Sequence, residues 1–138
     1  MKNYLFGGIL ILAFLTACQD ADLPKVNGMW QLKTIQEKDH TTQAVDTVYF
    51  SFQRQAIFSY TLLNGDTSKP NSTVIIYGYV DFPAENKMHI QLDKNNLNGY
   101  HTSRVLWKGE QVTYDILKLN SKELILGQEG TRYHFIKF

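Results

Sequence analysis

The hydrophobic residues of this chain follow a two-residue period from Gly28 to the C-terminus. Successive side chains of a β-strand point to opposite faces, so this period predicts strands with one buried face. No stretch of this region has the 3.6-residue period of an amphipathic helix. The predicted strands span residues 28–35, 47–53, 56–62, 73–81, 87–93, 112–119, 123–127 and 131–138.

Short polar turns separate these strands and suggest how they connect. Asn64-Gly65, Asn120-Ser121 and Glu129-Gly130 have the composition of tight turns, and Pro83 is expected to end the fourth strand. The segment 93–109 lacks the alternation and is predicted to be irregular. We therefore expect about eight antiparallel strands in up-and-down order. Such a sheet either closes into a barrel, which removes its edges, or splits into a sandwich, and the consecutive hairpins favour the barrel.

Both faces of the predicted strand 73–81 are apolar, which is unusual for a sheet with one face in water. Val74 and Ile76 lie on one face, and Tyr77 and Tyr79 lie on the other. Either one face lines a cavity or the other face meets a partner. A third interpretation is that the tyrosines cover the sheet surface and keep their hydroxyl groups in water.

The N-terminal segment has a different pattern. A basic start at Lys2 precedes the apolar run 4–14, and small residues lead to Cys18, the only cysteine of the chain. This order is typical of a secretory signal. The apolar run is shorter than the roughly 20 residues of a membrane-spanning helix. Cys18 has no partner for an internal disulfide. Its position at the end of a secretory signal therefore indicates another role for this cysteine.

The sequence Leu15-Thr16-Ala17-Cys18 resembles the signal box of bacterial lipoproteins. The resemblance implies a signal peptide over 1–17, a lipidated Cys18 that begins a tether over 18–27, and a domain over 28–138. It also implies a lipid anchor in the bacterial cell envelope, at the outer membrane, on its periplasmic face or at the cell surface. The alternative is an ordinary signal peptide whose cut precedes an unmodified cysteine.

Charge and motifs exclude several classes of function. The chain carries 14 Lys and Arg against 13 Asp and Glu, and like charges do not gather in runs, so we expect no nucleic-acid partner. The four histidines, His40, His89, His101 and His134, do not have the spacing of metal ligands. No glycine-rich phosphate loop or nucleophile motif is present. We therefore expect no metal, no cofactor, no catalytic residues and no enzymatic activity.

A resemblance to a known family rests on Gly28-Met29-Trp30 and on the second tryptophan, Trp107. Gly-x-Trp at the start of the first strand resembles the first lipocalin motif, and together with the segments 114–119 and 133–137 it resembles the lipocalin-like lipoproteins of the Bacteroides type. The resemblance covers residues 26–138 and implies a lipocalin-like, calycin-type, up-and-down β-barrel. It also implies a basic side chain from the chain end over Trp30, for which Arg132 is the candidate.

These observations lead to two hypotheses of function. The first is a lipid-anchored barrel that binds a small apolar or amphipathic ligand in an aromatic-lined mouth. The candidate lining residues are Trp30, Phe50, Phe58, Tyr60, Tyr77 and Trp107. The alternative is a non-enzymatic interaction module that docks an envelope protein or a glycan through exposed aromatic residues.

Overall fold

The structure is a computed structural model, and it describes residues 26–44, 47–54, 56–63, 73–96, 106–107 and 109–138. The predicted signal peptide, Cys18 and most of the predicted tether lie outside the described residues. So do His101 and residues 64–72.

The described chain forms nine strands in one antiparallel sheet. Each predicted strand is present, with ends that coincide with the prediction or differ from it by at most three residues. The strands are β1 (Gly28–Glu37), β2 (His40–Ala44), β3 (Val48–Gln53), β4 (Ile57–Leu63), β5 (Thr73–Ala84), β6 (Lys87–Leu92), β7 (Gln111–Leu119), β8 (Glu123–Gln128) and β9 (Thr131–Lys137). A short 3₁₀ helix, η2 (Lys94–Asn96), follows β6.

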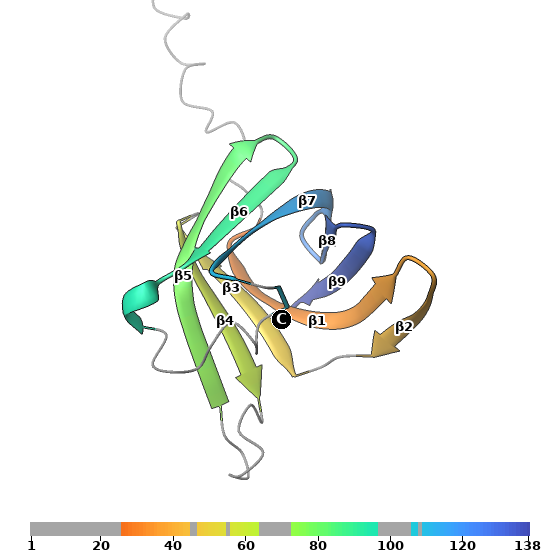
Figure 1. Cartoon of the computed structure of the whole chain (residues 1–138), viewed down its shortest axis with the longest axis horizontal. Helices are drawn as coiled ribbons and strands as arrows, with labels where there is room; N and C mark the ends of the chain where they lie inside the picture. The colour runs from red at the N-terminus through yellow and green to blue at the C-terminus, as the bar shows by residue number, and fades with distance from the viewer. Residues whose placement is uncertain (1–25, 45–46, 55, 64–72, 97–105, 108) are drawn as a thin grey trace, which may run out of the picture.

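The sheet closes on itself because β9 returns to pair with β1. Trp30 lies opposite Lys137, and Gln36 lies opposite Arg132, along this seam. All strands except β2 follow one another around the ring, so eight strands form a closed antiparallel barrel (Figure 1). The predicted barrel is confirmed and the sandwich is excluded, since closure satisfies the backbone groups of the first and last strands.

On the edge opposite β9, β1 pairs with two different strands in succession. Its first residues, Gly28–Gln31, pair with β3, whereas Thr34–Glu37 pair with β2. The strand β2 was not predicted, because its sequence His-Thr-Thr-Gln-Ala has no hydrophobic alternation. It forms as the return of a hairpin from β1 and stays outside the ring (Figure 1).

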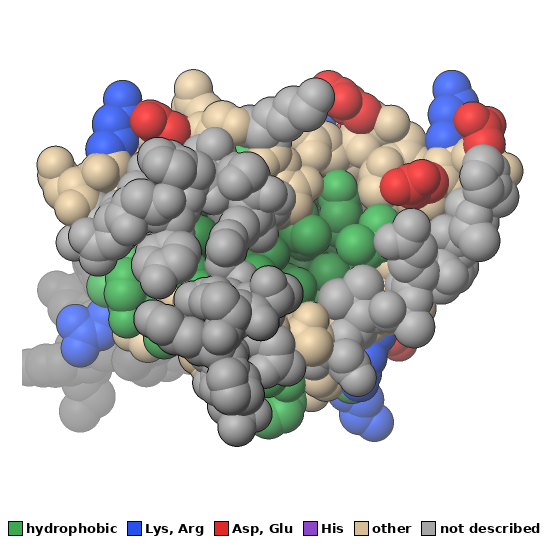
Figure 2. Space-filling view, turned by 60° about the horizontal axis from the view of Figure 1, so that its bottom comes forward, with side chains coloured by type: hydrophobic (Ala, Val, Ile, Leu, Met, Phe, Trp, Pro, Cys, Tyr) green, Lys and Arg blue, Asp and Glu red, His purple; other side chains and the backbone are tan. Residues whose placement is uncertain are grey.

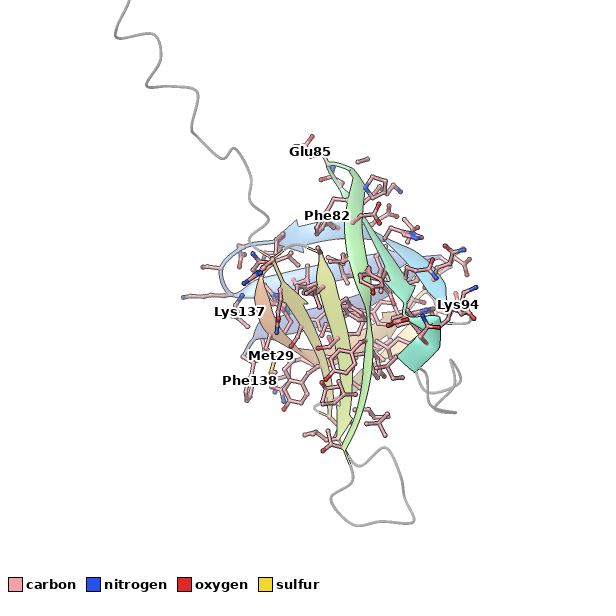
Figure 3. All side chains as sticks on the ribbon, turned by 90° about the vertical axis from the view of Figure 1, so that its left-hand side faces the viewer. Met29, Phe82, Glu85, Lys94, Lys137 and Phe138 are labelled. Atoms are coloured by element: carbon pink, nitrogen blue, oxygen red, sulfur yellow. The ribbon has the colours of Figure 1, made fainter. Side chains whose placement is uncertain are left out.

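The strand β5 is longer than its sequence predicts. Pro83 was expected to end it, but β5 continues to Ala84, and its pairing with β6 shifts register between Asp81 and Ala84. A proline has no N–H to donate, and such residues are accommodated at irregularities of this kind. The hairpin of β5 and β6, with Phe82 and Glu85, projects beyond the barrel (Figure 3).

The antiparallel order gives the barrel two distinct ends. The start of β1, the end of β9 and the β3–β4, β5–β6 and β7–β8 turns lie at one end, which we call the Trp30 end. The β4–β5, β6–β7 and β8–β9 connections lie at the opposite end, which we call the loop end. The chain therefore enters the barrel at the end opposite the longer connections.

The barrel interior is hydrophobic, as the alternation predicts. Inward residues of every ring strand are buried, and no polar or charged residue is among the buried residues that the structure describes. In the space-filling view, hydrophobic side chains lie in a recess near the middle of one face (Figure 2). The largest fully buried side chains are Trp30, Tyr60, Tyr114, Phe50, Phe52, Phe58, Phe135, Leu32, Ile76, Met88, Ile90 and Leu92.

A bulge in β1 corrects one detail of the predicted pattern. Strict alternation places Thr34 inward after Trp30 and Leu32, but the pairing with β9 shifts register between Leu32 and Thr34. The extra residue, Lys33, reverses the parity of the strand. Ile35 consequently packs against the core in place of Thr34.

Candidate functional site

Aromatic side chains dominate one region of the barrel interior, with Phe50 of β3 at its centre. The Phe50 ring centre lies 5.0 Å from that of Phe58, 5.7 Å from Tyr60 and 4.7 Å from Phe135. These residues come from β3, β4 and β9, so the closure of the sheet brings them together. Edge-to-face and tilted contacts at such separations are favourable aromatic geometries.

Trp107 joins this cluster from outside every strand. It lies between β6 and β7, a connection at the loop end, and only 6% of its surface is exposed. Its ring centre lies 6.3 Å from Phe58, 6.4 Å from Tyr60 and 6.2 Å from Tyr114. The Trp107 indole therefore occupies the space between the β3–β4 wall and β7.

Two polar atoms in this region are buried without a hydrogen-bond partner among the described residues. They are Nε1 of Trp107 and the hydroxyl of Tyr114, whose side chain is fully buried. Burial raises the pKa of Tyr114, with smaller contributions from Tyr133 and Tyr60. Burial also raises the pKa of Tyr60 to about 12. The Tyr114 and Tyr60 hydroxyl groups thus stay protonated at neutral pH. Nε1 of Trp107 and the Tyr114 hydroxyl, the two atoms without a partner among the described residues, present two hydrogen-bond donors.

The Trp30 end of the barrel is closed by contacts around Trp30. The Trp30 Nε1 donates to the Val26 carbonyl oxygen at 2.7 Å, and Val26 is itself buried. Nζ of Lys137 lies 4.5 Å from the Trp30 ring centre and donates to the carbonyl oxygen of Asn27. Loss of solvation lowers the pKa of Lys137. The side chain near Trp30 is therefore Lys137, and the expectation that Arg132 fills this place is wrong.

Gly28 suits this closure for two reasons. Its φ is +117°, in the region that favours glycine, and a Cβ built at this position would overlap the Lys137 side chain. The Gly-x-Trp sequence thus has a local physical basis, because the glycine makes room for the cation beside the tryptophan. Lys137, Met29 and Phe138 lie on the same side of the molecule (Figure 3).

The structure brings five of the six predicted lining residues into the interior. Trp30, Phe50, Phe58, Tyr60 and Trp107 are buried, and Phe50 contacts or pairs with each of the other four. Tyr77 is different.

Tyr77 lies on the outer face of β5 with 49% of its surface exposed, so it does not line the interior. The neighbouring inward position, Ile76, is buried. Because both faces of this strand are apolar, the sequence did not indicate which face points inward.

The sequence interpretation missed Tyr114, Tyr133 and Phe135 as interior aromatic residues. All three are buried, and the Tyr114 and Tyr133 rings lie 5.6 Å apart. The alternation of β7 contained the signal for Tyr114, since Val112 shares its inward parity. The contact of Tyr114 with Trp107 could not be deduced from the sequence, because Trp107 lies in no strand and no alternation places it.

The outer face of β4 and β5 carries an exposed apolar stripe, defined by Ile57, Ile75, Tyr77 and Tyr79. Ile57 lies directly opposite Tyr79, which is 57% exposed. Tyr77 and Ile75 follow at two-residue steps along the same strand face. The stripe therefore lies on the outer face, where the partner-surface interpretation of this strand requires it.

The outer face of β6–β8 forms a shallow polar groove. Lys87 pairs with Asp115 there, and Nδ1 of His89 lies 2.9 Å from Oγ1 of Thr113. His134 lies 3.2 Å from a Glu123 oxygen on the neighbouring strands. The part of the chain that the structure describes holds no group of acidic, histidine or cysteine residues suited to a metal ion. It also has no helix long and apolar enough to cross a membrane.

Comparison with known proteins agrees with this architecture. The sequence profile of the lipocalin-like domain matches residues 12–138. The crystal structure of a lipocalin-like protein from Bacteroides uniformis is 26% identical with a TM-score of 0.73, covering 83% of this chain and 100% of that one. An uncharacterized protein from Bacteroides eggerthii is 25% identical with a TM-score of 0.65, covering 82% and 99%. Among curated proteins, none matches the chain at a significant level.

Proposed function

Because this chain belongs to the lipocalin-like domain family, we propose that its barrel binds a small apolar or amphipathic molecule without a chemical step. The observation that carries the proposal is the composition of the barrel interior. Its wall around Phe50, Phe58, Tyr60 and Trp107 is aromatic, and no charged side chain is buried in the described part of the chain. Such an interior favours a ligand that buries apolar surface against these aromatic side chains.

The driving force would be the removal of apolar ligand surface from water, which contributes roughly 25 cal/mol per Å². The Trp30 end is closed by the Val26, Trp30 and Lys137 contacts, so entry is proposed from the loop end. Trp107 comes from a connection at that end and lies in no strand. A displacement of its indole would therefore not break the backbone hydrogen bonds between the barrel strands.

Native mass spectrometry of the purified protein provides the first test, because a retained small molecule would appear as added mass and identify its class. A second test is titration with the fluorescent apolar probe N-phenylnaphthylamine. We expect its fluorescence to rise with the wild-type protein and to fall when Trp107 is replaced by alanine. The matched control is Tyr79→Ala on the outer face, which should bind the probe like wild type. Absence of probe binding, or equal loss in both variants, would contradict the proposal.

The lipid anchor is a separate part of the proposal and rests on the sequence around Cys18. The chain enters the barrel at Val26, eight residues after Cys18, and such a segment spans at most about 30 Å when extended. The Trp30 end would then face the membrane of the cell envelope and the loop end would face away. Labelling cells with radioactive palmitate should mark the wild-type protein, and Cys18→Ser should abolish the label. An equally labelled variant would exclude this anchor.

A second candidate function is favoured by the exposed stripe of Ile57, Ile75, Tyr77 and Tyr79. Clustered exposed aromatic side chains are enriched at interaction surfaces. Under this alternative the stripe docks an envelope protein or a glycan. Crosslinking in intact cells should then give an adduct that the double variant Tyr77→Ala/Tyr79→Ala loses, with little change in melting temperature. Leu117→Ala, on an exposed site of β7, is the control and should keep the adduct.

A further inference from the structure

We infer that the polar group of the bound molecule is a neutral oxygen acceptor, such as an ester, ketone or amide carbonyl, held by Nε1 of Trp107 and the hydroxyl of Tyr114. This inference rests on the proposed binding function and adds the chemical class of the ligand. The two atoms are the buried polar side-chain atoms that have no hydrogen-bond partner among the described residues.

The two donors lie on neighbouring side chains. Trp107 is 6% exposed and Tyr114 is 0% exposed, and their ring centres lie 6.2 Å apart at an interplanar angle of 84°. An indole N–H can only donate, whereas a phenol can donate or accept. A buried donor without an acceptor is costly, so most buried polar groups have a partner. An acceptor atom within hydrogen-bond distance of both donors would satisfy the two groups at once.

The charges around the interior favour an uncharged acceptor. The described interior holds no Lys, Arg or His side chain that could neutralise an anion. A carboxylate moved there from water would lose its hydration without gaining a counter-charge. Burial raises the pKa of Tyr133, and Glu37 and Glu129 at the loop end make smaller contributions in the same direction. These carboxylates add a negative field on the side from which a ligand would enter, so a neutral acceptor is favoured over an anion.

The aromatic rings next to Trp107 provide an apolar surface for the rest of the ligand. Phe50 and Phe58 also contact Trp107 and carry no polar side-chain atom. The apolar part of the molecule would pack against these rings. A compound with one carbonyl and a short hydrocarbon chain or ring system therefore has the required chemistry.

The test uses three probes of similar length: methyl octanoate as the neutral ester, octanoate at neutral pH as the anion, and n-nonane without an acceptor. Each is titrated to displace N-phenylnaphthylamine from the full chain. We expect the ester to bind about fivefold or more tightly than the alkane and the anion, which is the effect of a net hydrogen bond. Tyr114→Phe and Trp107→Phe should each reduce ester affinity toward that of the alkane. Tyr79→Phe, a hydroxyl deletion on the outer face, should leave all three affinities unchanged.

The outcomes separate this inference from the proposed function. Equal affinities of ester and alkane would mean that water satisfies the two donors, and tightest binding of octanoate would mean that an anion is preferred. Either result overturns the inference and leaves ligand binding standing. Failure of N-phenylnaphthylamine itself to bind would overturn both. Removal of an unpartnered hydroxyl should not unfold the barrel, so the melting temperature of Tyr114→Phe should equal or exceed that of wild type.

Discussion

Lys137 and Trp30 are directly opposite residues on β9 and β1, and Nζ of Lys137 lies 4.5 Å from the centre of the Trp30 ring. The pair joins the last strand of the barrel to the first, and it covers the Trp30 end. Nζ also donates to the carbonyl oxygen of Asn27, just before β1. One side chain thus links barrel closure, the entry of the chain and the cap over the interior.

Replacement of Lys137 by alanine should destabilise the barrel by about 1 to 2 kcal/mol, because the cation–π contact and a hydrogen bond are lost. Lys137→Arg keeps a cation beside the Trp30 ring and should therefore reduce the free energy of unfolding by less than Lys137→Ala does. Urea unfolding followed by circular dichroism measures the difference. Lys118→Ala, which breaks an exposed ion pair with Glu123, is the control and should change stability by less than about 1 kcal/mol. Equal losses in the two alanine variants would contradict a special role for Lys137.

Gly28→Ala should be destabilising by about 1 to 3 kcal/mol, since the new Cβ meets the Lys137 side chain and the φ of +117° strains a non-glycine residue. A double-mutant cycle separates the two causes. In the Lys137→Ala background the overlap disappears and only the backbone strain remains. Gly28→Ala should therefore reduce the free energy of unfolding by less in that background than in the wild-type protein. Additive effects of the two substitutions would show that the side chains do not interact.

Phe50→Ala should cost about 3 to 5 kcal/mol, because it leaves a cavity at the centre of the aromatic cluster. The matched control is Phe138→Ala, which removes the same group at a position that is 73% exposed. This control should change the free energy of unfolding by less than about 1 kcal/mol. A Phe50 variant with near-wild-type stability would mean that the interior can collapse around the missing ring.

Stability should fall at alkaline pH because of the buried tyrosines. An unfolded tyrosine ionises near pH 10, whereas burial raises the pKa of Tyr60 to about 12 in the folded protein. Deprotonation between these values favours the unfolded chain, so the contribution is intact below pH 10 and is lost as pH rises toward 12. For this residue the loss is on the order of 2 kcal/mol. Tyr60→Phe should show a shallower decline of melting temperature above pH 10, and an unchanged slope would contradict the assignment.

The outline of the fold was readable from the alternation of residue types. β3, with Val48, Phe50 and Phe52 inward, appears as predicted, because a strand with one buried face must repeat every two residues. The sequence alone did not reveal β2 or the bulge at Lys33. β2 has no hydrophobic face, and the bulge is a property of the pairing between β1 and β9, which is absent from either strand alone.

The candidate site was predictable in part for the same reason. Phe50, Phe58 and Tyr60 could be assigned to an inward face from their parity. Tyr77 was misassigned as a lining residue because both faces of β5 are apolar, and parity does not say which face is inside. Lys137 and Arg132 are both basic residues near the chain end, and only the register of β9 against β1 places Lys137 beside Trp30.

The sequence by itself therefore determined the all-β class, the approximate limits of the ring strands and most of the residues that become buried. These properties depend on local period and turn chemistry, which act over a few residues. The tertiary structure decided that the sheet closes and that Lys137 caps Trp30. It also decided that Trp107 and Tyr114 meet with their donors unpartnered among the described residues. The closure and the Lys137–Trp30 pair join segments distant in the sequence, and they follow from strand register, which no single segment encodes. Trp107 and Tyr114 are only seven residues apart, and their contact depends on the packing of a residue outside the strands into the interior.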